Sequence, residues 1–247
     1  MKKKIYKDYT ILHYEALDST NDKAQELAKQ GLKMNKTVVI SDIQNKGRGR
    51  NNRKWESYPG NLFASIILFL NNKQKNIHEL SFLIAIAINE AIRCELKNSK
   101  IKIENKWPND IVVDSKKISG TLIESQFQNN EILYNIVGVG INIKNKPLET
   151  IFPACCINDF SKEISVENIL QNFLDNLDKF LLQWQNFGFL PIRNKWLENA
   201  WNINKEVSII TQSKKITGIF ENIDSEGNIE IKSQDGLIKL NIGDVTL

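Results

Sequence analysis

The first residues that could do chemistry lie in a loop that mixes glycine with basic side chains. Five cations and no acid occupy nine consecutive positions, namely Lys46, Arg48, Arg50, Arg53 and Lys54. Glycine lets backbone N–H groups approach an anion closely, and guanidinium groups pair well with phosphate and carboxylate oxygens. Trp55 follows and could stack on a base or ring. Composition alone leaves three interpretations open: a solvated basic loop, a nucleic-acid-binding arm, and a loop that closes over a phosphorylated small molecule.

The second group is Lys106-Trp107-Pro108-Asn109-Asp110, with Lys117 seven residues further on. Pro108 restricts Trp107 to an extended backbone, so Asn109 and Asp110 are expected at a turn from which they project. If residues 111–126 form a hairpin, Lys117 lies near the same turn. An amide, a carboxylate and an ammonium would then converge. The plain alternative is an ordinary Asn-Asp turn beside a surface lysine.

Two further segments are weaker signals when taken alone. Gly138-Val139-Gly140-Ile141-Asn142 places glycines inside a strand, which indicates close backbone approach, a bulge or a packing requirement. It is not a GxGxxG pattern, so a dinucleotide-binding strand is disfavoured. Ser19-Thr20-Asn21 precedes a helical apolar repeat and is typical of a helix cap.

The elements that must position these residues follow from the periodicity of the sequence. Strands are expected at residues 11–16, 37–43, 62–70, 102–107, 111–113, 118–126 and 132–143, with a loop at 44–61. Helices are expected after Ser19, at 77–96, at 166–184 and after Pro191. Consecutive hairpins imply antiparallel pairing, so we predict an α+β fold with a mixed, largely antiparallel sheet and packed helices. After about Asn204, short strands alternate with turns, which predicts a small β-barrel.

Composition excludes several classes of protein. The 247 residues are 41% hydrophobic and 25% charged, which excludes wholesale disorder and a fibrous chain. The net charge of +4 is too small to indicate a nucleic-acid binder by itself. Three cysteines are too few and odd in number, which excludes a disulfide scaffold. The missing CxxC spacing and the presence of only two histidines argue against a zinc site, so we expect free thiols. No apolar run approaches the ~18 residues that span a membrane, so we expect a cytoplasmic protein without a membrane segment.

Taken together, the segments resemble the biotin protein ligases, or biotin–[acetyl-CoA-carboxylase] ligases. The matching motifs are Asp18-Ser19-Thr20-Asn21, Gln44-x-x-Gly47-Arg48-Gly49-Arg50, Trp55 with Gly60-Asn61-Leu62, Lys106-Trp107-Pro108-Asn109-Asp110, Lys117-x-x-Gly120 and Gly138-x-Gly140-Ile141-Asn142. They occur in the family's order and at its spacing over about residues 10–145. The resemblance implies a catalytic domain of class II aminoacyl-tRNA synthetase-like fold over residues 1–203 and an SH3-like β-barrel over residues 204–247.

The resemblance also implies the reaction and its partners. ATP, with Mg²⁺ bound mainly through its phosphates, activates biotin to biotinyl-5′-AMP. A lysine of the biotin carboxyl carrier protein of acetyl-CoA carboxylase then accepts the biotin. A homodimer is compatible with the resemblance. The family's dual-function members carry an N-terminal winged helix-turn-helix, whereas the catalytic pattern here begins near residue 10, so we expect a monofunctional ligase without specific DNA binding.

The resemblance assigns roles to individual residues. Lys117, Arg48 and Asp110 are the expected catalytic residues. The expected biotin-binding residues are Ser19, Thr20, Asn21, Gln44, Gly47, Arg48, Gly49, Arg50, Lys117 and Gly120. The expected nucleotide-binding residues are Arg50, Arg53, Trp55, Asn109, Asp110, Lys117 and Asn142.

Two departures and two alternatives accompany the resemblance. Asn52 stands where the family usually has glycine, and we expect it to keep the loop's shape because asparagine tolerates the left-handed region. Ser57-Tyr58-Pro59-Gly60 replaces the usual Ser-Pro-x-Gly, and Tyr58 receives no role. A lipoate or octanoate ligase is the alternative enzyme. An RNA-binding protein that uses the basic loop is the alternative of another class, and the missing aromatic-rich RNA-binding signature counts against it.

Overall fold

The computed structural model describes residues 1–70, 77–96, 100–129, 131–150, 152–161, 164–211 and 214–246. They form two compact units. The first unit comprises Met1–Ile77 and Lys116–Asn172, and the second comprises His78–Ser115 and Phe173–Leu247. The domain boundary that the sequence predicts, between residues 203 and 204, falls inside the second unit.

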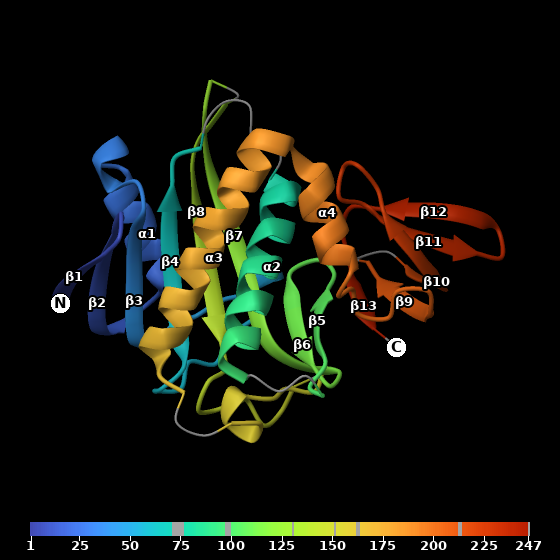
Figure 1. Cartoon of the computed structure of the whole chain (residues 1–247), viewed down its shortest axis with the longest axis horizontal. Coiled ribbons are helices and arrows are strands. Elements are labelled where there is room, and N and C mark those ends of the chain that lie inside the picture. The colour runs from blue at the N-terminus through green and yellow to red at the C-terminus, as the bar shows by residue number, and fades with distance from the viewer. Residues whose placement is uncertain are drawn as a thin grey trace. The chain divides into compact units, whose positions relative to one another are not determined.

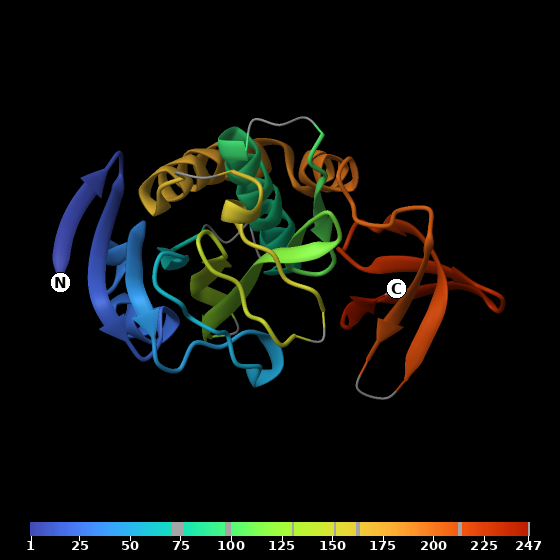
Figure 2. The same ribbon diagram turned by 90° about the horizontal axis from the view of Figure 1, so that it is seen from below.

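The first unit contains six hydrogen-bonded strands in the order β1-β2-β3-β4-β8-β7 (Figure 1). The strands are β1 (Lys2–Tyr6), β2 (Tyr9–Leu17), β3 (Thr37–Gln44), β4 (Leu62–Leu68), β7 (Lys116–Gln128) and β8 (Glu131–Ile141). β2 and β3 are parallel, and the other pairs are antiparallel. Figure 2 shows β1 alongside β2 at the N-terminal edge of these strands.

Helix α1 (Thr20–Ala28) packs on one face of these strands. Its buried alanines, Ala24 and Ala28, meet Val39, Ile67 and Ile136 in one apolar cluster. Short 3-10 turns at Leu32–Met34, Arg50–Asn52 and Ile157–Asp159 complete the connections. Because α1 is short, this apolar contact rather than helix propensity fixes its position, and with it the direction of its N-terminus.

The second unit contains three helices and a hairpin. The helices are α2 (Ile77–Leu96), α3 (Val166–Phe187), whose first turns belong to the other unit, and α4 (Phe189–Leu197). Strands β5 (Ile103–Lys106) and β6 (Asp110–Val113) form the antiparallel hairpin. Phe82 of α2 packs edge-on against Phe189 and Trp196 of α4, with ring centroids 5.4 and 5.0 Å apart. The indole N–H of Trp184 donates to Glu79 at 2.6 Å, which ties α3 to α2.

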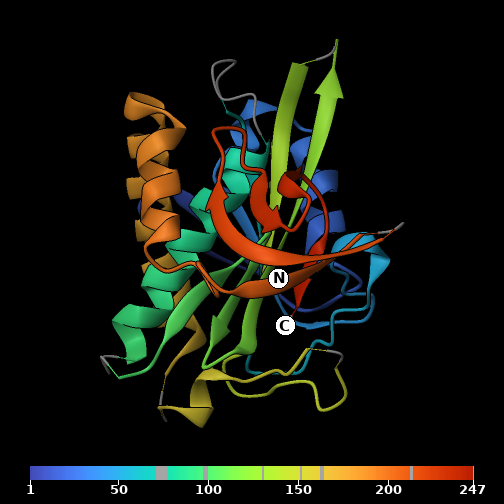
Figure 3. The same ribbon diagram turned by 90° about the vertical axis from the view of Figure 1, so that its right-hand side faces the viewer.

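The C-terminal strands form a separate antiparallel sheet in the order β12-β11-β10-β9-β13. Their bounds are β9 (Glu206–Ile210), β10 (Lys215–Ile223), β11 (Ile229–Ser233), β12 (Gly236–Leu240) and β13 (Asp244–Thr246). Figure 3 shows these strands as strongly curved ribbons. Alternate residues such as Ile216, Phe220 and Ile231 are buried, so one face of the sheet provides its own small core.

The predicted α+β class, with a mixed and largely antiparallel sheet, is confirmed. The predicted helix at 77–96 is found with the same bounds. Two details differ: β1 was not predicted, because three of its five residues are lysines, and α4 begins at Phe189, two residues before Pro191. The three cysteines are free thiols, as expected. Across the described residues, no helix combines the length and the apolar character needed to cross a membrane.

Candidate active site

The start of α1 joins several predicted biotin-binding residues into one hydrogen-bonded group. Ser19 caps the helix, and its hydroxyl accepts from the backbone N–H of Asp22 at 3.3 Å. Thr20 and Asn21 follow and are buried. The backbone N–H and the hydroxyl of Thr20 both donate to Oε1 of Gln44, at 2.9 and 3.1 Å. The end of β3 is thereby bonded to the first turn of α1.

Three glycines, Gly120, Gly138 and Gly140, form a patch of the sheet beneath this helix start, which we call the glycine patch. Ser65 of β4 pairs with Gly138 of β8, and Gly140 lies between Phe63 and Gly120. Directly paired residues of antiparallel strands point to the same face, and this is the face that α1 covers. Because Gly138 and Gly140 of β8 and Gly120 of β7 have no side chains, the backbone of the sheet is uncovered at this patch.

Asn21 packs against the glycine patch. Its Oδ1 lies 2.5 Å from the hydroxyl of Ser65, which is also 2.8 Å from Oγ1 of Thr20. A Cβ on Gly138 would lie only 2.4 Å from Oδ1 of Asn21. The requirement for glycine at 138 is therefore a close contact with a polar side chain, which fits the close approach that the sequence indicates.

Arg48 ties the basic loop to α1 and β7. One terminal nitrogen donates to Asp22 at 2.7 Å and to both oxygens of Glu124 at 3.0 and 3.1 Å, and the other lies 3.3 Å from the hydroxyl of Ser19. The hydrogen bond with Asp22 raises the pKa of Arg48, partial burial opposes the rise, and the bonds with Glu124 add to it. The guanidinium of Arg48 is thus charged and already paired with two carboxylates.

The loop between β3 and β4 folds back on itself at its glycines. The N–H of Gly49 donates to the carbonyl of Arg53 at 2.8 Å, and the N–H of Trp55 donates to the carbonyl of Gly47 at 2.9 Å. A Cβ on Gly47 would lie 2.8 Å from both Oγ of Ser57 and the backbone oxygen of Trp55. Asn52 has φ +55°, so the expected left-handed conformation at this position is confirmed.

Trp55 and Lys117 meet over the glycine patch. The ammonium nitrogen of Lys117 lies 5.3 Å from the centre of the Trp55 ring, within cation–π range. A Cβ on Gly140 would lie 2.6 Å from the Trp55 indole, so the ring rests directly on the backbone of β8. Among the described residues, nothing accepts a hydrogen bond from the buried indole N–H of Trp55.

Two buried asparagines organise the chain just after β8. The side-chain N–H of Asn142 donates to the carbonyl of Cys155 at 3.1 Å. Oδ1 of Asn61 accepts the backbone N–H groups of Ile143, Lys144 and Asn145 at 2.9–3.0 Å. Asn61 therefore shapes the turn that follows Asn142, one of the predicted nucleotide-binding residues. The backbone N–H of Asn142 donates to the carbonyl of Ile118.

The second unit holds the other predicted nucleotide residues. Asn109 and Asp110 follow Trp107 and Pro108, which are joined by a cis peptide bond. The ammonium of buried Lys106 lies 3.8 Å from the Asp110 carboxylate. The indole N–H of Trp107 donates to the backbone carbonyl of Gly227, in the turn between β10 and β11, at 3.3 Å. Because Lys117 belongs to the first unit, its convergence with Asn109 and Asp110 stays a prediction.

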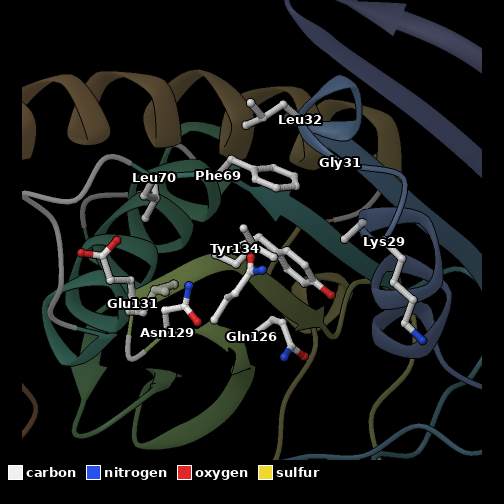
Figure 4. Close-up of a pocket in the computed structure, with 13 residues that line it drawn as sticks. Lys29, Gly31, Leu32, Phe69, Leu70, Gln126, Asn129, Glu131 and Tyr134 are labelled. Atoms are coloured by element: carbon white, nitrogen blue, oxygen red, sulfur yellow. The ribbon is translucent and has the colours of Figure 1, made fainter.

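A cavity of about 780 Å³ lies elsewhere in the first unit (Figure 4). Its walls come from the end of α1, the end of β4 and the turn between β7 and β8, including Ala28, Leu70 and Asn129. None of the predicted site residues lines it. The cavity lies at the C-terminal end of α1 and the start of β8, whereas the polar group lies at the N-terminal end of α1 and the end of β8.

Sequence reasoning missed three residues that contact residues of the predicted motifs, two in the first unit and one in the second. Ser65 offered a signal, because it is the one polar residue in the strand Leu62–Leu68 and is fully buried. Glu124 lies in a strand of mixed polarity and offered none. Gly227 belongs to a turn more than one hundred positions after Trp107, and such a contact has no local signature.

Metal-binding side chains are not clustered in the described part of the chain. Among these residues, no three His, Cys, Asp or Glu side chains lie close enough together to hold a metal ion. In the α1 region, Asp22 and Glu124 share one cation, and that cation is Arg48. A divalent ion at this site would need most of its ligands from a bound phosphate group or from water.

Comparison with known proteins assigns the two parts of the sequence to two families of domain. Residues 14–142 match the sequence model of the biotin/lipoate A/B protein ligase family. Residues 203–247 match the model of the biotin protein ligase C-terminal domain. A biotin–[acetyl-CoA-carboxylase] ligase of Paracoccus denitrificans is 29% identical over 89% of this chain and 92% of its own. The bifunctional ligase/repressor BirA of Bacillus spizizenii is 30% identical over 96% of this chain and 74% of its own.

Solved structures resemble the whole fold. A biotin protein ligase from Aquifex aeolicus in complex with biotin and ATP superposes with a TM-score of 0.81 at 27% identity, covering 96% of this chain and 97% of that one. A ligase from Leishmania major in complex with biotinyl-5-AMP has a TM-score of 0.67 at 23% identity, covering 94% and 98%. At that identity, the second likeness concerns the fold.

Proposed function

Because the chain belongs to the biotin/lipoate A/B protein ligase family, we propose that it is a biotin protein ligase: it activates biotin with ATP and transfers it to a lysine of a biotin carboxyl carrier protein. The observation that carries the proposal is the hydrogen-bonded group of Thr20, Asn21, Gln44 and Arg48 beside the glycine patch. These are the biotin-side residues of the motif pattern, and they meet in space although the sequence separates them. The Paracoccus and Aquifex relatives, which are named for this activity, support it.

The first half-reaction joins two anions. A carboxylate oxygen of biotin attacks the α-phosphorus of ATP, the bond to the bridging oxygen of the β-phosphate breaks, and pyrophosphate leaves. Lys117 is the residue that we place between the biotin carboxylate and the α-phosphate, because its cationic group is held over the glycine patch by Trp55. Charge that develops on the phosphate oxygens would be stabilised by this ammonium and by Arg50 and Arg53 from the loop.

The second half-reaction needs a protected intermediate. The amine of the carrier lysine attacks the acyl carbon of biotinyl-5′-AMP, AMP leaves, and the amine loses its proton. Water would hydrolyse the same mixed anhydride, so the Gly47–Trp55 loop is assigned the task of covering it. The close approach of Ser57 and Trp55 to Gly47 supports a defined conformation of this loop.

The nucleotide side is assigned to Trp55, Asn109, Asp110 and Asn142, together with Arg50, Arg53 and Lys117. Magnesium, when bound on the ATP phosphates, would neutralise charge there, and Asp110 is the carboxylate that we place nearest to it. Lys106 lies 3.8 Å from the Asp110 carboxylate and thereby limits the orientations open to it. We also assign residues 1–203 to catalysis and residues 204–247 to an SH3-like barrel, and place the enzyme in the cytoplasm with its ATP. The absence of specific DNA binding and the homodimer stay predictions.

A carrier-acylation experiment tests the proposal against the lipoate or octanoate alternative. The protein is incubated with ATP, Mg²⁺, a carrier domain and either biotin, lipoate or octanoate, and intact-mass measurement follows the carrier. We expect the mass of one biotinyl group to be added to the carrier lysine, with neither lipoate nor octanoate competing. Acylation by lipoate or octanoate in preference to biotin, or RNA binding without acylation, would refute the assignment.

A further inference from the structure

Glu124 of β7 is bonded to two different parts of the biotin-side group. Both of its carboxylate oxygens accept from Arg48, at 3.0 and 3.1 Å. One of them also accepts from the side-chain amide of Asn21 at 2.7 Å. A single carboxylate therefore connects the basic loop to the first turn of α1. Glu124 is not among the residues to which the sequence assigned a role.

Asn21 has its hydrogen-bonding groups directed at the protein. Its amide N–H groups face Glu124 and the carbonyl of Leu122, at 2.7 and 3.5 Å, and its oxygen faces Ser65. The side chain is 4% exposed and touches the backbone of Gly138. Its role is therefore to hold the start of α1 against the glycine patch, and its orientation depends on Glu124.

Glu124 and Asp22 share the charge of Arg48 but differ in their surroundings. The Asp22 side chain is 53% exposed, and its carboxylate accepts one hydrogen bond of 2.7 Å from Arg48. Among the described residues, it makes no hydrogen bond with the side chain of Asn21. The Glu124 carboxylate is 27% exposed and bonds both partners. Solvent screens an exposed pair more strongly, so the Glu124 contact is the stronger constraint on the loop.

We propose that Glu124 is a positioning residue for biotin: it bonds both Arg48 and Asn21 and so holds the glycine-rich loop and the start of α1 in the arrangement that binds the substrate. The inference rests on the proposed function, because it names biotin as the ligand of this site. It assigns Glu124 no contact with the reacting atoms. Its effect should therefore appear in biotin affinity and in the stability of the closed loop, while the rate of the chemical step stays close to normal.

Glu124→Gln is the sharpest variant, because it keeps the size of the side chain. Glutamine replaces one acceptor oxygen by a donor, which then faces the donor nitrogens of Arg48 or Asn21. Asp22→Asn is the matched control: it removes the other carboxylate of Arg48 and leaves Asn21 untouched. Glu124→Asp keeps the charge on a shorter side chain and should restore part of the effect.

The first readout is tryptic cleavage of the loop without biotin or ATP, since five Lys and Arg residues lie between residues 46 and 54. Proteolysis of a loop reports the population of its open form. We expect Glu124→Gln to be cut about tenfold faster than wild type and Asp22→Asn within about twofold of it, the size that charged hydrogen bonds allow. Cleavage of Glu124→Gln at the wild-type rate would overturn the proposal.

The second readout is steady-state kinetics in carrier biotinylation. We expect Glu124→Gln to raise the KM for biotin about tenfold, with kcat and the KM for ATP within about twofold of wild type, and Glu124→Asp to recover part of it. A lower kcat with an unchanged KM for biotin, together with a lower Tm, would show a merely structural role and overturn the proposal. If wild type does not use biotin, the proposed function fails, while the cleavage experiment still decides whether Glu124 holds the loop.

Discussion

The polar group at the start of α1 and the segment around Trp107 are held in place by different contacts. We call the first the α1 group, made of Ser19, Thr20, Asn21, Gln44, Arg48, Ser65 and Glu124. Its members bond one another through side chains from β3, β4, β7 and the basic loop. The Trp107 segment, residues 106–110, is instead held by the N–H of Trp107 on the carbonyl of Gly227 and by the Lys106–Asp110 pair.

The two groups are therefore built in different ways. The α1 group is a polar network of buried and half-buried side chains, in which a replacement removes a hydrogen-bond partner from another member, so defects should appear as lost biotin affinity. The Trp107 segment depends on a distant turn of the C-terminal sheet, so defects there should appear as altered use of ATP. The predictions below test this division, beginning with the residue that both substrates should need.

Lys117→Ala should have the largest effect. The ammonium is proposed to lie between two anions, and charged hydrogen bonds of this kind are worth roughly 1.5–3 kcal/mol, so adenylation should fall at least about tenfold. Lys116→Ala, at the exposed neighbouring lysine, is the matched control. Both are measured by pyrophosphate exchange, with Tm recorded in parallel. An unchanged rate in Lys117→Ala would remove the residue from the mechanism.

Gly138→Ala should break the α1 group without touching the Trp107 segment. The added methyl would lie 2.4 Å from Oδ1 of Asn21, and such overpacking costs about 1–3 kcal/mol. We expect the KM for biotin to rise about tenfold, the KM for ATP to change little and Tm to fall by a few degrees.

Gly31→Ala, just after α1, serves as the comparison for Gly138→Ala. Gly31 has φ +91° and open space around an added Cβ, so this substitution strains the backbone without a clash and should lower Tm while leaving the KM for biotin nearly unchanged. Equal effects of the two substitutions on the KM for biotin would contradict the close contact at Gly138.

Gly227→Ala tests the other half of the division. Gly227 has φ +85°, and an added Cβ would lie 3.0 Å from Phe82 of α2, so the turn whose carbonyl accepts from Trp107 would be strained and crowded. The backbone strain alone costs roughly 1–2 kcal/mol. We expect a higher KM for ATP, a nearly normal KM for biotin and a lower Tm, whereas Gly236→Ala, which also has positive φ but open space around it, should lower Tm alone.

The smallest effect is expected at Asp224, in the same turn, and it concerns the stability of the fold at acid pH. Burial tends to raise its pKa, but hydrogen bonds from Asn228, Glu226 and Lys239 outweigh burial and lower the pKa to about 2. A carboxylate with a lowered pKa stabilises the fold above its unfolded pKa near 4 and loses that contribution as the pH falls through about 2. The contribution is up to about 2 kcal/mol. Wild type should therefore lose more stability than Asp224→Asn between pH 4 and pH 2, as measured by urea unfolding, and parallel curves would contradict this.

The sequence predicted most elements because their patterns are local. The apolar runs of β4 and α2 and the cap at Ser19 each depend on a few neighbouring residues. β1 was missed because an edge strand rich in lysine has no apolar pattern. The motif residues could likewise be found, but the residues that hydrogen-bond to them could not. Glu124 and Gly227 contact residues far away in sequence, and these contacts depend on the register of β7 and on the path of the C-terminal sheet.

Biotin-dependent exchange of labelled pyrophosphate into ATP is the sharpest single test of the proposed activity, because it requires a reversible adenylate and no carrier protein. We expect rapid exchange with biotin and Mg²⁺, none with lipoate or octanoate, and a higher biotin requirement in Glu124→Gln and Gly138→Ala but not in Gly227→Ala. Exchange that depends on lipoate or octanoate, or no exchange with biotin in a protein that melts cooperatively, would contradict it.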